Sequence, residues 1–181
     1  MRFVADNWTV VVVGAWNRAI LTPEGISRRL FGLTEGSPIQ VEVPIDGIAP
    51  YRVKHDHLIV LADSTKITIG MEECCLTNLK KAMDIGVKAL LNLPETPVYA
   101  SGINVRFKSE GFPAELSQLL MTKLDNSISD AGYTIAIRKV SRSLILDSGH
   151  LNLYIDVTQE GTCELLLNFH RQSRKQLELE Q

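Results

Sequence analysis

The stretch 57–91 most constrains how this chain can fold, because it joins two predicted strands to the longest predicted helix. An apolar run at 58–62 is followed by a short polar turn at 63–66 and by a second apolar run at 67–70, which together predict a β-hairpin. The helix predicted over 76–91 carries apolar residues at steps of three and four, and Pro94 prevents its continuation. A hairpin that runs into a helix is typical of an α+β fold.

A similar pattern begins again at His150. Residues 57–65 and 150–158 share His, Leu, Asp and Thr at matching positions and keep apolar residues at most of the others. We therefore expect a duplicated unit of strand, helix, four strands and helix, with one copy over 8–94 and the other over 96–181. A chance succession of similar elements is the alternative.

The remaining elements of the first copy follow from local signals. After a frayed lead-in, the β-branched run at 9–15 predicts a strand. Thr22 and Pro23 predict a helix start, Gly32 predicts its end, and Ile26 and Leu30 give this helix an apolar face. Two further strands are predicted at 39–45 and 51–53. In the long helix, the predicted apolar face holds Leu76, Leu79, Met83, Val87, Leu90 and Leu91.

The second copy is predicted in the same way. It has a strand at 97–108, a helix that opens at Pro113, and a polar connection at 125–132. Four strands are then predicted at 133–139, 143–146, 151–157 and 162–169, with a final helix near Arg171.

Composition narrows the classes of function. The chain of 181 residues is 45% apolar, which is enough to build a core, and its net charge of -2 lacks the basic excess of a non-specific nucleic-acid binder. The longest apolar run, at 10–13, is far shorter than a membrane span needs. The first residues carry no leader pattern. We expect a cytoplasmic protein with no membrane contact, for which nucleic acid is not the expected partner.

No motif in the sequence indicates catalysis or a cofactor. Phosphate-cradling, dinucleotide-binding, nucleophile-elbow and zinc-protease patterns are all missing, so we expect no cofactor and a non-catalytic protein. The three cysteines, Cys74, Cys75 and Cys163, lack a C-x-x-C spacing and are expected to be free thiols. His55 and His57 are expected to be solvated turn residues, and a metal pair is the alternative.

Strand alternation predicts a polar surface in the second copy. One side of its strands should form the core, with Tyr133, Ile135, Ile137, Leu151, Leu153, Ile155, Cys163, Leu165, Leu167 and Phe169. The other side should form an open face for a ligand or partner, on which Tyr154 and Arg106 are the best anchors. That face is predicted to hold Asn104, Arg106, Arg138, Asn152, Tyr154, Asp156, Glu164 and Asn168. A solvated face of mixed charge is the alternative.

In the first copy the corresponding positions are apolar. Ile59 and Leu61 align with Asn152 and Tyr154, and the run at 10–13 is apolar on both sides. Exposed apolar patches usually mark contact sites. We therefore expect a homodimer or a protein partner through Ile59, Leu61, Val11 and Val13.

The order and length of the elements resemble the duplicated fold of the TATA-binding protein family. This resemblance spans 9–169, rests on topology, and implies a curved, mainly antiparallel sheet with helices on one face. In that family the concave face binds the DNA minor groove, and paired Phe side chains wedge between base steps. The five Phe residues here form no close pairs around the strand turns: Phe3, Phe31, Phe107, Phe112 and Phe169.

The sequence thus predicts an α+β fold and a non-catalytic binding or protein-interaction module that uses its open sheet face. Two alternatives remain open at this point: a nucleic-acid-binding module, and an enzyme with an unrecognised site.

Overall fold

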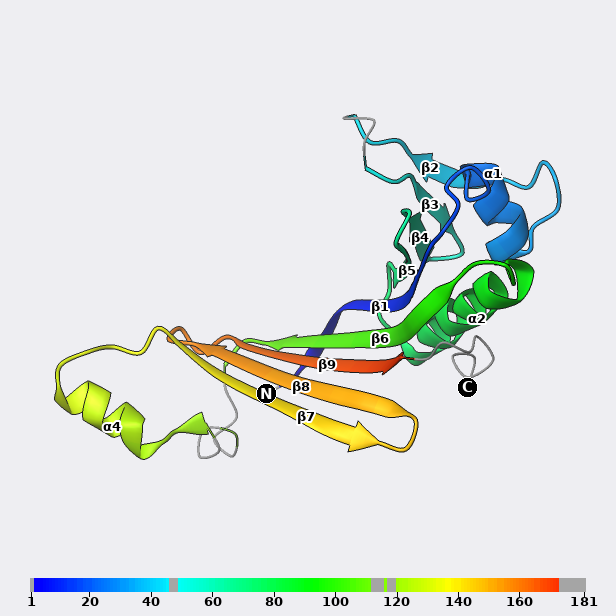
Figure 1. Ribbon diagram of the computed structural model, residues 1–181. Helices are drawn as coiled ribbons and strands as arrows, with labels where there is room; N and C mark the ends of the chain where they lie inside the picture. The colour runs from blue at the N-terminus through cyan, green and yellow to red at the C-terminus, as the bar shows by residue number, and fades with distance from the viewer. Residues whose placement is uncertain (1, 46–48, 112–115, 117–119, 173–181) are drawn as a thin grey trace. The chain divides into compact units, whose positions relative to one another are not determined.

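The computed structural model describes residues 2–45, 49–111, 116 and 120–172 (Figure 1). These residues form an α+β fold built on an antiparallel sheet. Its strands are β1 (Val4–Gly14), β2 (Gln40–Glu42), β3 (Arg52–His55), β4 (Leu58–Ala62), β5 (Lys66–Met71), β6 (Val98–Ser109), β7 (Ile137–Leu146), β8 (Gly149–Thr158) and β9 (Cys163–Gln172). Its helices are α1 (Pro23–Ile26), the π-helix η1 (Ser27–Phe31), α2 (Leu76–Asn92) and α4 (Lys123–Asp130).

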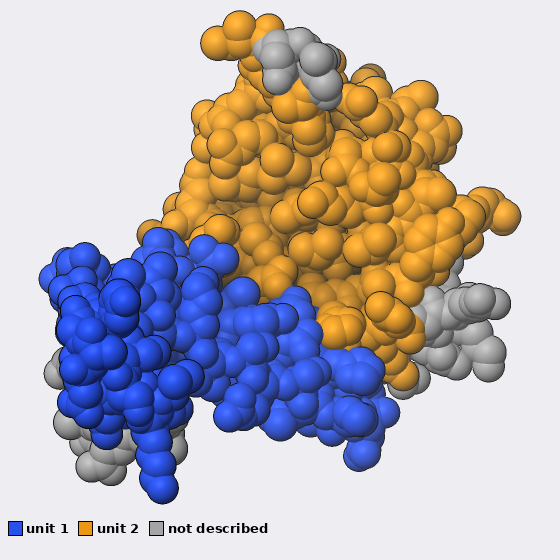
Figure 2. Space-filling model, turned by 60° about the vertical axis from the view of Figure 1, so that its left-hand side comes forward, with its two compact units in different colours: residues 1–6, 105–169 blue, residues 7–104, 170–181 orange. Residues whose placement is uncertain are grey.

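The hydrogen-bonded strand order is β2-β3-β4-β5-β1-β6-β9-β8-β7. The chain divides into two compact units, coloured separately in Figure 2. Unit 1 holds residues 1–6 and 105–169, and unit 2 holds residues 7–104 and 170–181. Strands β1, β6 and β9 each contribute residues to both units.

Unit 2 packs α2 against one side of its strands. The helix lies where the sequence predicts it, but of the predicted apolar face only Leu90 is buried. Its buried residues are Asn78, Ala82, Ile85, Gly86, Ala89 and Leu90, whereas Leu76, Met83 and Leu91 are exposed. Small side chains let the helix approach the sheet, and Gly86 faces Val10, Val12 and Ile69. Residue size therefore decides the buried face of this helix more than the spacing of the large apolar residues.

The short helix of unit 2 begins and ends as predicted. The Thr22 side chain accepts a hydrogen bond from the Gly25 amide at 3.1 Å, and Pro23 occupies the first turn. Gly32 ends the segment with a left-handed φ of 75°, which glycine adopts without strain. Ile26 and Leu30 are both buried. The segment is not one α-helix, however, because α1 passes into the π-helix η1 after Ile26.

Strand lengths in unit 2 depart from prediction at two places. The expected lead-in is wrong from Val4 onward, because β1 already begins there. The predicted strand at 39–45 is much shorter, since β2 ends at Glu42 and both Val43 and Ile45 are exposed. By contrast, β4 spans the predicted residues.

In residues 133–172, which the structure describes, the second half has three strands rather than the predicted four. The segments 133–139 and 143–146 were predicted as separate strands, but β7 runs unbroken through 137–146. The predicted polar connection at 125–132 is largely α4, which Thr122 caps by accepting from the Asp125 amide. Most of the helix predicted from Pro113 lies outside the described residues, as does the chain after Gln172. The final helix predicted near Arg171 does not begin there, because Arg171 belongs to β9.

The core formed by the described residues of unit 1 is small. Leu120, Val157 and Cys163 are buried, and Phe3, Val140 and Ile155 pack against them. Burial raises the pKa of the Cys163 thiol, with the nearby Glu164 charge adding to the effect. No residue of α4 is buried. The predicted core members Tyr133 and Ile137 are both exposed. Tyr133 precedes β7, and the register places Ile137 on the same side of the sheet as Lys139, away from the buried cluster.

Candidate functional site

The candidate site lies on the polar side of the sheet in unit 1, and the β7–β8 register builds it. Lys139 pairs with Asp156, and Ser141 pairs with Tyr154. Residues directly opposite in an antiparallel pair project from the same side of the sheet. A two-residue loop fixes this register, because it places Leu146 opposite Gly149. These four side chains therefore share one side.

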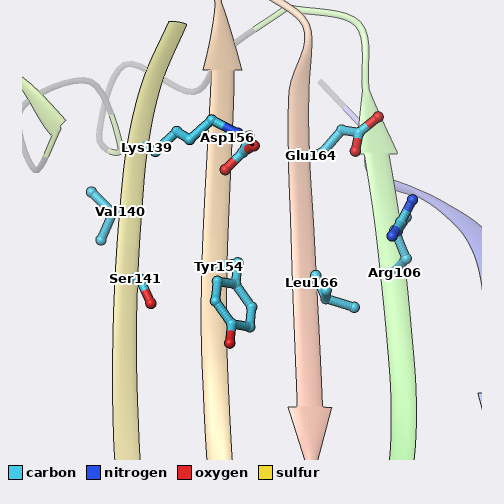
Figure 3. Close-up of a pocket in the computed structure, with 8 residues that line it drawn as sticks. All are labelled: Arg106, Lys139, Val140, Ser141, Tyr154, Asp156, Glu164 and Leu166. Atoms are coloured by element: carbon cyan, nitrogen blue, oxygen red, sulfur yellow. Dashed lines mark hydrogen bonds and ion pairs between the residues drawn. The ribbon is translucent and has the colours of Figure 1, made fainter.

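Residues from four strands line an open hollow of about 330 Å³ on this side (Figure 3). We call it the polar hollow. Figure 3 shows the Tyr154 ring between Ser141 and Leu166, with Arg106 and Glu164 at the β6 side and Lys139 and Asp156 at the β7 side. Its lining residues are Arg106, Lys139, Val140, Ser141, Tyr154, Asp156, Glu164 and Leu166.

Ion pairs hold the charged groups of the polar hollow in place. Lys139 Nζ lies 2.5 Å from Asp156 Oδ2. Next to the hollow, Lys108 Nζ lies 3.1 Å from Asp6 Oδ2 and 3.5 Å from Glu164 Oε1. The hydrogen bond to Asp6, followed by the charges of Asp6 and Glu164, raises the pKa of Lys108 above its usual value. The site therefore presents fixed charges of both signs.

The chemistry of the polar hollow suits binding. Arg106 and Lys139 are basic, Asp156 and Glu164 are acidic, and Leu166 supplies an apolar contact. Tyrosine adds a large amphipathic surface of the kind that often anchors interfaces. The lining residues include no histidine or cysteine, so the hollow itself holds neither of the side chains that most often act as base or thiol nucleophile.

The structure gathers part of the predicted partner face. Arg106, Tyr154 and Glu164 line the polar hollow. Asn152 and Asn168 join β8 to β9 on the same side, with Asn152 Nδ2 donating to Asn168 Oδ1 at 3.0 Å. Asn104 Nδ2 donates to Thr9 Oγ1 at 3.1 Å within unit 2. These three asparagines do not line the hollow.

Arg138 is wrongly assigned to that face by the sequence reasoning. The register pairs it with Val157, so its side chain leaves the opposite side of the sheet. There Arg138 Nε donates to Asp125 Oδ2 at 2.9 Å, an interaction that holds the pKa of Asp125 below its usual value, with help from Thr122. A separate strand over 133–139 with Ile137 in the core would place Arg138 on the open face. In the structure, Ile137 itself lies on the side of the polar hollow, so Arg138 lies on the other side.

Sequence reasoning missed Lys139, Ser141 and Leu166 as members of the site. The signal that could have found the first two is the loop at 147–148. A two-residue hairpin loop fixes which residues face each other, and counting back from it places Lys139 opposite Asp156 and Ser141 opposite Tyr154. The position of Leu166 could have been predicted without the loop. It lies two residues from Glu164 along β9, so the two side chains share one side of the sheet.

The four residues predicted to form a dimer face lie on one side of the sheet in unit 2. Val11 and Leu61 both face Thr68, Ile59 faces Gly70, and Val13 faces Lys66. We call these four residues the apolar row. Arg52 pairs with Leu61 and Lys54 with Ile59, so cationic side chains border it. Val13 is 37% exposed, and the other three are half-buried. The helix α2 packs on the other side, against Val10 and Val12.

The two histidines predicted as solvated turn residues differ, and the prediction is wrong for His55, which is half-buried at the end of β3. Asp56 and His57 form the two-residue β3–β4 loop, with φ of 48° and 63°. The ring centroids of His55 and Phe31 are 5.4 Å apart, whereas His57 Nδ1 lies 3.8 Å from Glu72 Oε2. Within the described residues, no cluster of three or more His, Cys, Asp or Glu could hold a metal ion.

No helix of the described chain is long and apolar enough to span a membrane. Comparison with known proteins found no match to any family model, curated protein or solved structure. The resemblance to the TATA-binding protein family therefore stays a prediction.

Proposed function

We propose that this chain is a non-catalytic binding module that takes a protein partner in the polar hollow of unit 1. The single observation that carries the proposal is that four strands contribute residues to one hollow. Arg106, Tyr154 and Glu164 are among the residues that line it. Both charge signs beside an amphipathic ring match the composition of a peptide segment better than that of a polyanion. A phosphate backbone would need a net basic surface, whereas here two basic side chains face two acidic ones.

The apolar row suggests a second role for the other unit. We propose that a second copy of the chain covers Val11, Val13, Ile59 and Leu61. The register supports this, because it brings these aliphatic side chains from β1 and β4 to one side of the sheet. Their apolar surface is of the kind that stable homodimers bury.

Strand order supports the proposed duplication. Counting outward from the adjacent β1 and β6, β5 corresponds to β9, β4 to β8, and β3 to β7. The aligned segments 57–65 and 150–158 contain most of β4 and β8, and so occupy corresponding places. On this proposal, the polar hollow and the apolar row are diverged versions of one surface.

A titration followed by amide NMR tests the polar hollow. The probes are a set of short peptides of mixed charge, a DNA duplex, a single-stranded oligonucleotide and a mixture of common metabolites. We expect peptides to shift the amides of β8 and β9 around Tyr154, because peptides of mixed charge combine both charges with apolar groups. Tyr154→Ser should weaken this binding about tenfold or more, whereas Tyr133→Ser, which removes an exposed ring elsewhere in unit 1, should not.

The same titration can contradict the proposal. Binding of an oligonucleotide with a steep dependence on salt would favour the nucleic-acid alternative. Chemical conversion of a metabolite would favour an enzyme. Peptide shifts confined to residues outside the polar hollow would remove its support.

A further inference from the structure

The strand β7 ends the sheet with a long, exposed edge. It pairs with β8 over ten residues, Ile137–Leu146, and its other side has no neighbour in the strand order of the described residues. Every residue from Ser141 to Leu146 is exposed. The exposed fractions of Leu144, Ile145 and Leu146 are 48%, 85% and 39%. An exposed apolar edge of this kind is a template for pairing with another strand.

The opposite edge of the sheet is protected, which makes the contrast informative. There β2 has only three residues. Its Glu42 carboxylate forms ion pairs with Arg52 at 3.3 Å and with Lys54 at 2.7 Å. Short edges with charged side chains resist strand addition. The last six residues of β7 form a longer edge, and Arg142 is the one charged side chain among them.

Arg142 differs from the other two basic residues of β7. Arg138 is paired with Asp125, and Lys139 with Asp156. Arg142 Nη1 instead donates to the Ser141 carbonyl oxygen at 2.8 Å. Arg142 forms no ion pair with any described residue. Its position in the register places it on the same side of the sheet as Leu144 and Leu146. One side of this edge thus reads cation, leucine, leucine.

We propose that the edge Ser141–Leu146 accepts an extended, antiparallel segment of another protein, with an acidic residue opposite Arg142 and apolar residues opposite Leu144 and Leu146. Main-chain hydrogen bonds supply affinity in this binding mode, and alternate side chains supply specificity. Antiparallel addition continues the β7–β8 pairing and is the more stable arrangement per residue.

Charge favours a foreign segment over a second copy. Residues Ile137–Leu146 contain three basic side chains and no carboxylate. If two copies of this edge paired antiparallel with their centre at Arg142, each Arg142 would lie opposite the other. Like charges directly opposite each other destabilise a strand pair. Pairing them about Leu144 would place each Arg142 opposite Leu146 and leave its charge without a carboxylate.

Two synthetic peptides test the proposal by fluorescence anisotropy and amide hydrogen exchange. The first, Val-Thr-Val-Thr-Glu-Thr-Val, places Glu opposite Arg142 when it pairs antiparallel with Val opposite Leu146. The second has Lys in place of Glu. We expect the Glu peptide to bind about three- to fivefold more tightly than the Lys peptide and to slow exchange in residues 141–146. Arg142→Glu should reverse the preference, and Lys123→Glu, an equal charge change on α4, should preserve it.

Three outcomes would overturn the proposal. The first is absence of saturable binding by either peptide. The second is equal affinity for both peptides on the wild type and on Arg142→Glu. The third is a dimer in sedimentation that the Glu peptide dissociates, because a second copy would then occupy the edge. Loss of peptide binding to the polar hollow would not bear on the edge, since Arg142 does not line that hollow.

Discussion

The two units of this protein differ in how their sheets are covered. In unit 2, α2 lies against β1 and β5, and Val12, Val53, Val60, Ile67 and Ile69 are fully buried. In unit 1, the buried cluster of described residues is limited to Leu120, Val157 and Cys163. The helix α4 buries none of its residues. Strand alternation alone therefore does not make a core, because a face becomes core only where another element packs on it.

The largest expected effect tests this difference directly. Ile69→Ala in unit 2 should lower the free energy of unfolding by about 2–5 kcal/mol, because it leaves a cavity in a packed core. Leu153→Ala in unit 1 should cost only about 1 kcal/mol, since the side chain is half-buried. Chemical denaturation, with hydrogen exchange to locate each loss, measures both. Equal losses would mean that unit 1 is covered as well as unit 2.

A smaller effect tests how closely α2 approaches its sheet. An added Cβ at Gly86 would lie 3.5 Å from a Val10 methyl and 3.6 Å from a Val12 methyl, which are ordinary contact distances. Gly86→Ala should therefore stabilise unit 2 by about 1 kcal/mol, because alanine favours the helix. The thermal midpoint measures this gain.

The matched control is Gly25→Ala, whose new methyl group would collide with the Ile20 carbonyl oxygen and should lower the midpoint. A lower midpoint for Gly86→Ala as well would contradict the described spacing between α2 and the strands.

The smallest effect concerns the ion pair between α4 and β7 in unit 1. Arg138 lowers the pKa of Asp125, so the pair stabilises the fold above the unfolded-state pKa of about 3.9. That contribution disappears as the pH falls through the lower, folded-state pKa. Asp125→Asn should lower the thermal midpoint at neutral pH, and the two midpoints should converge in strong acid.

Asp130→Asn, at the C-terminal end of the same helix, is the control for this pair. At neutral pH its midpoint should stay close to that of the wild type. A gap between wild type and Asp125→Asn that persists in strong acid would show that something other than this charge pair is lost.

The sequence predicted the parts of the fold that local chemistry determines. Thr22, Pro23 and Gly32 define their helix by capping and by backbone preference. The alternation in 58–62 and 163–169 placed Ile59, Leu61 and Glu164 on the sides where the structure has them. The spacing of large apolar residues missed most of the buried face of α2. Small residues pack as well as large ones when a helix lies close to a sheet.

The candidate site could be predicted only in part. Tyr154 and Arg106 followed from alternation, since each lies inside one unbroken strand. Arg138 did not, because the continuity of β7 through 137–146 is a tertiary property of its pairing with β8. No local turn signal marks where that strand begins. The register of the hairpin, rather than the composition of either strand, determines which charges reach the polar hollow.

Sedimentation equilibrium of three proteins tests the central claim, that the apolar row takes a second copy and the polar hollow takes a different partner. We expect the wild type to be a dimer, Leu61→Glu to be a monomer because it buries a charge in the contact, and Tyr154→Ser to remain a dimer. Leu76→Glu, at an exposed leucine of α2, controls for the added charge and should also remain a dimer. A wild-type monomer, an unchanged mass for Leu61→Glu, or dissociation by Tyr154→Ser would contradict this division between the two surfaces.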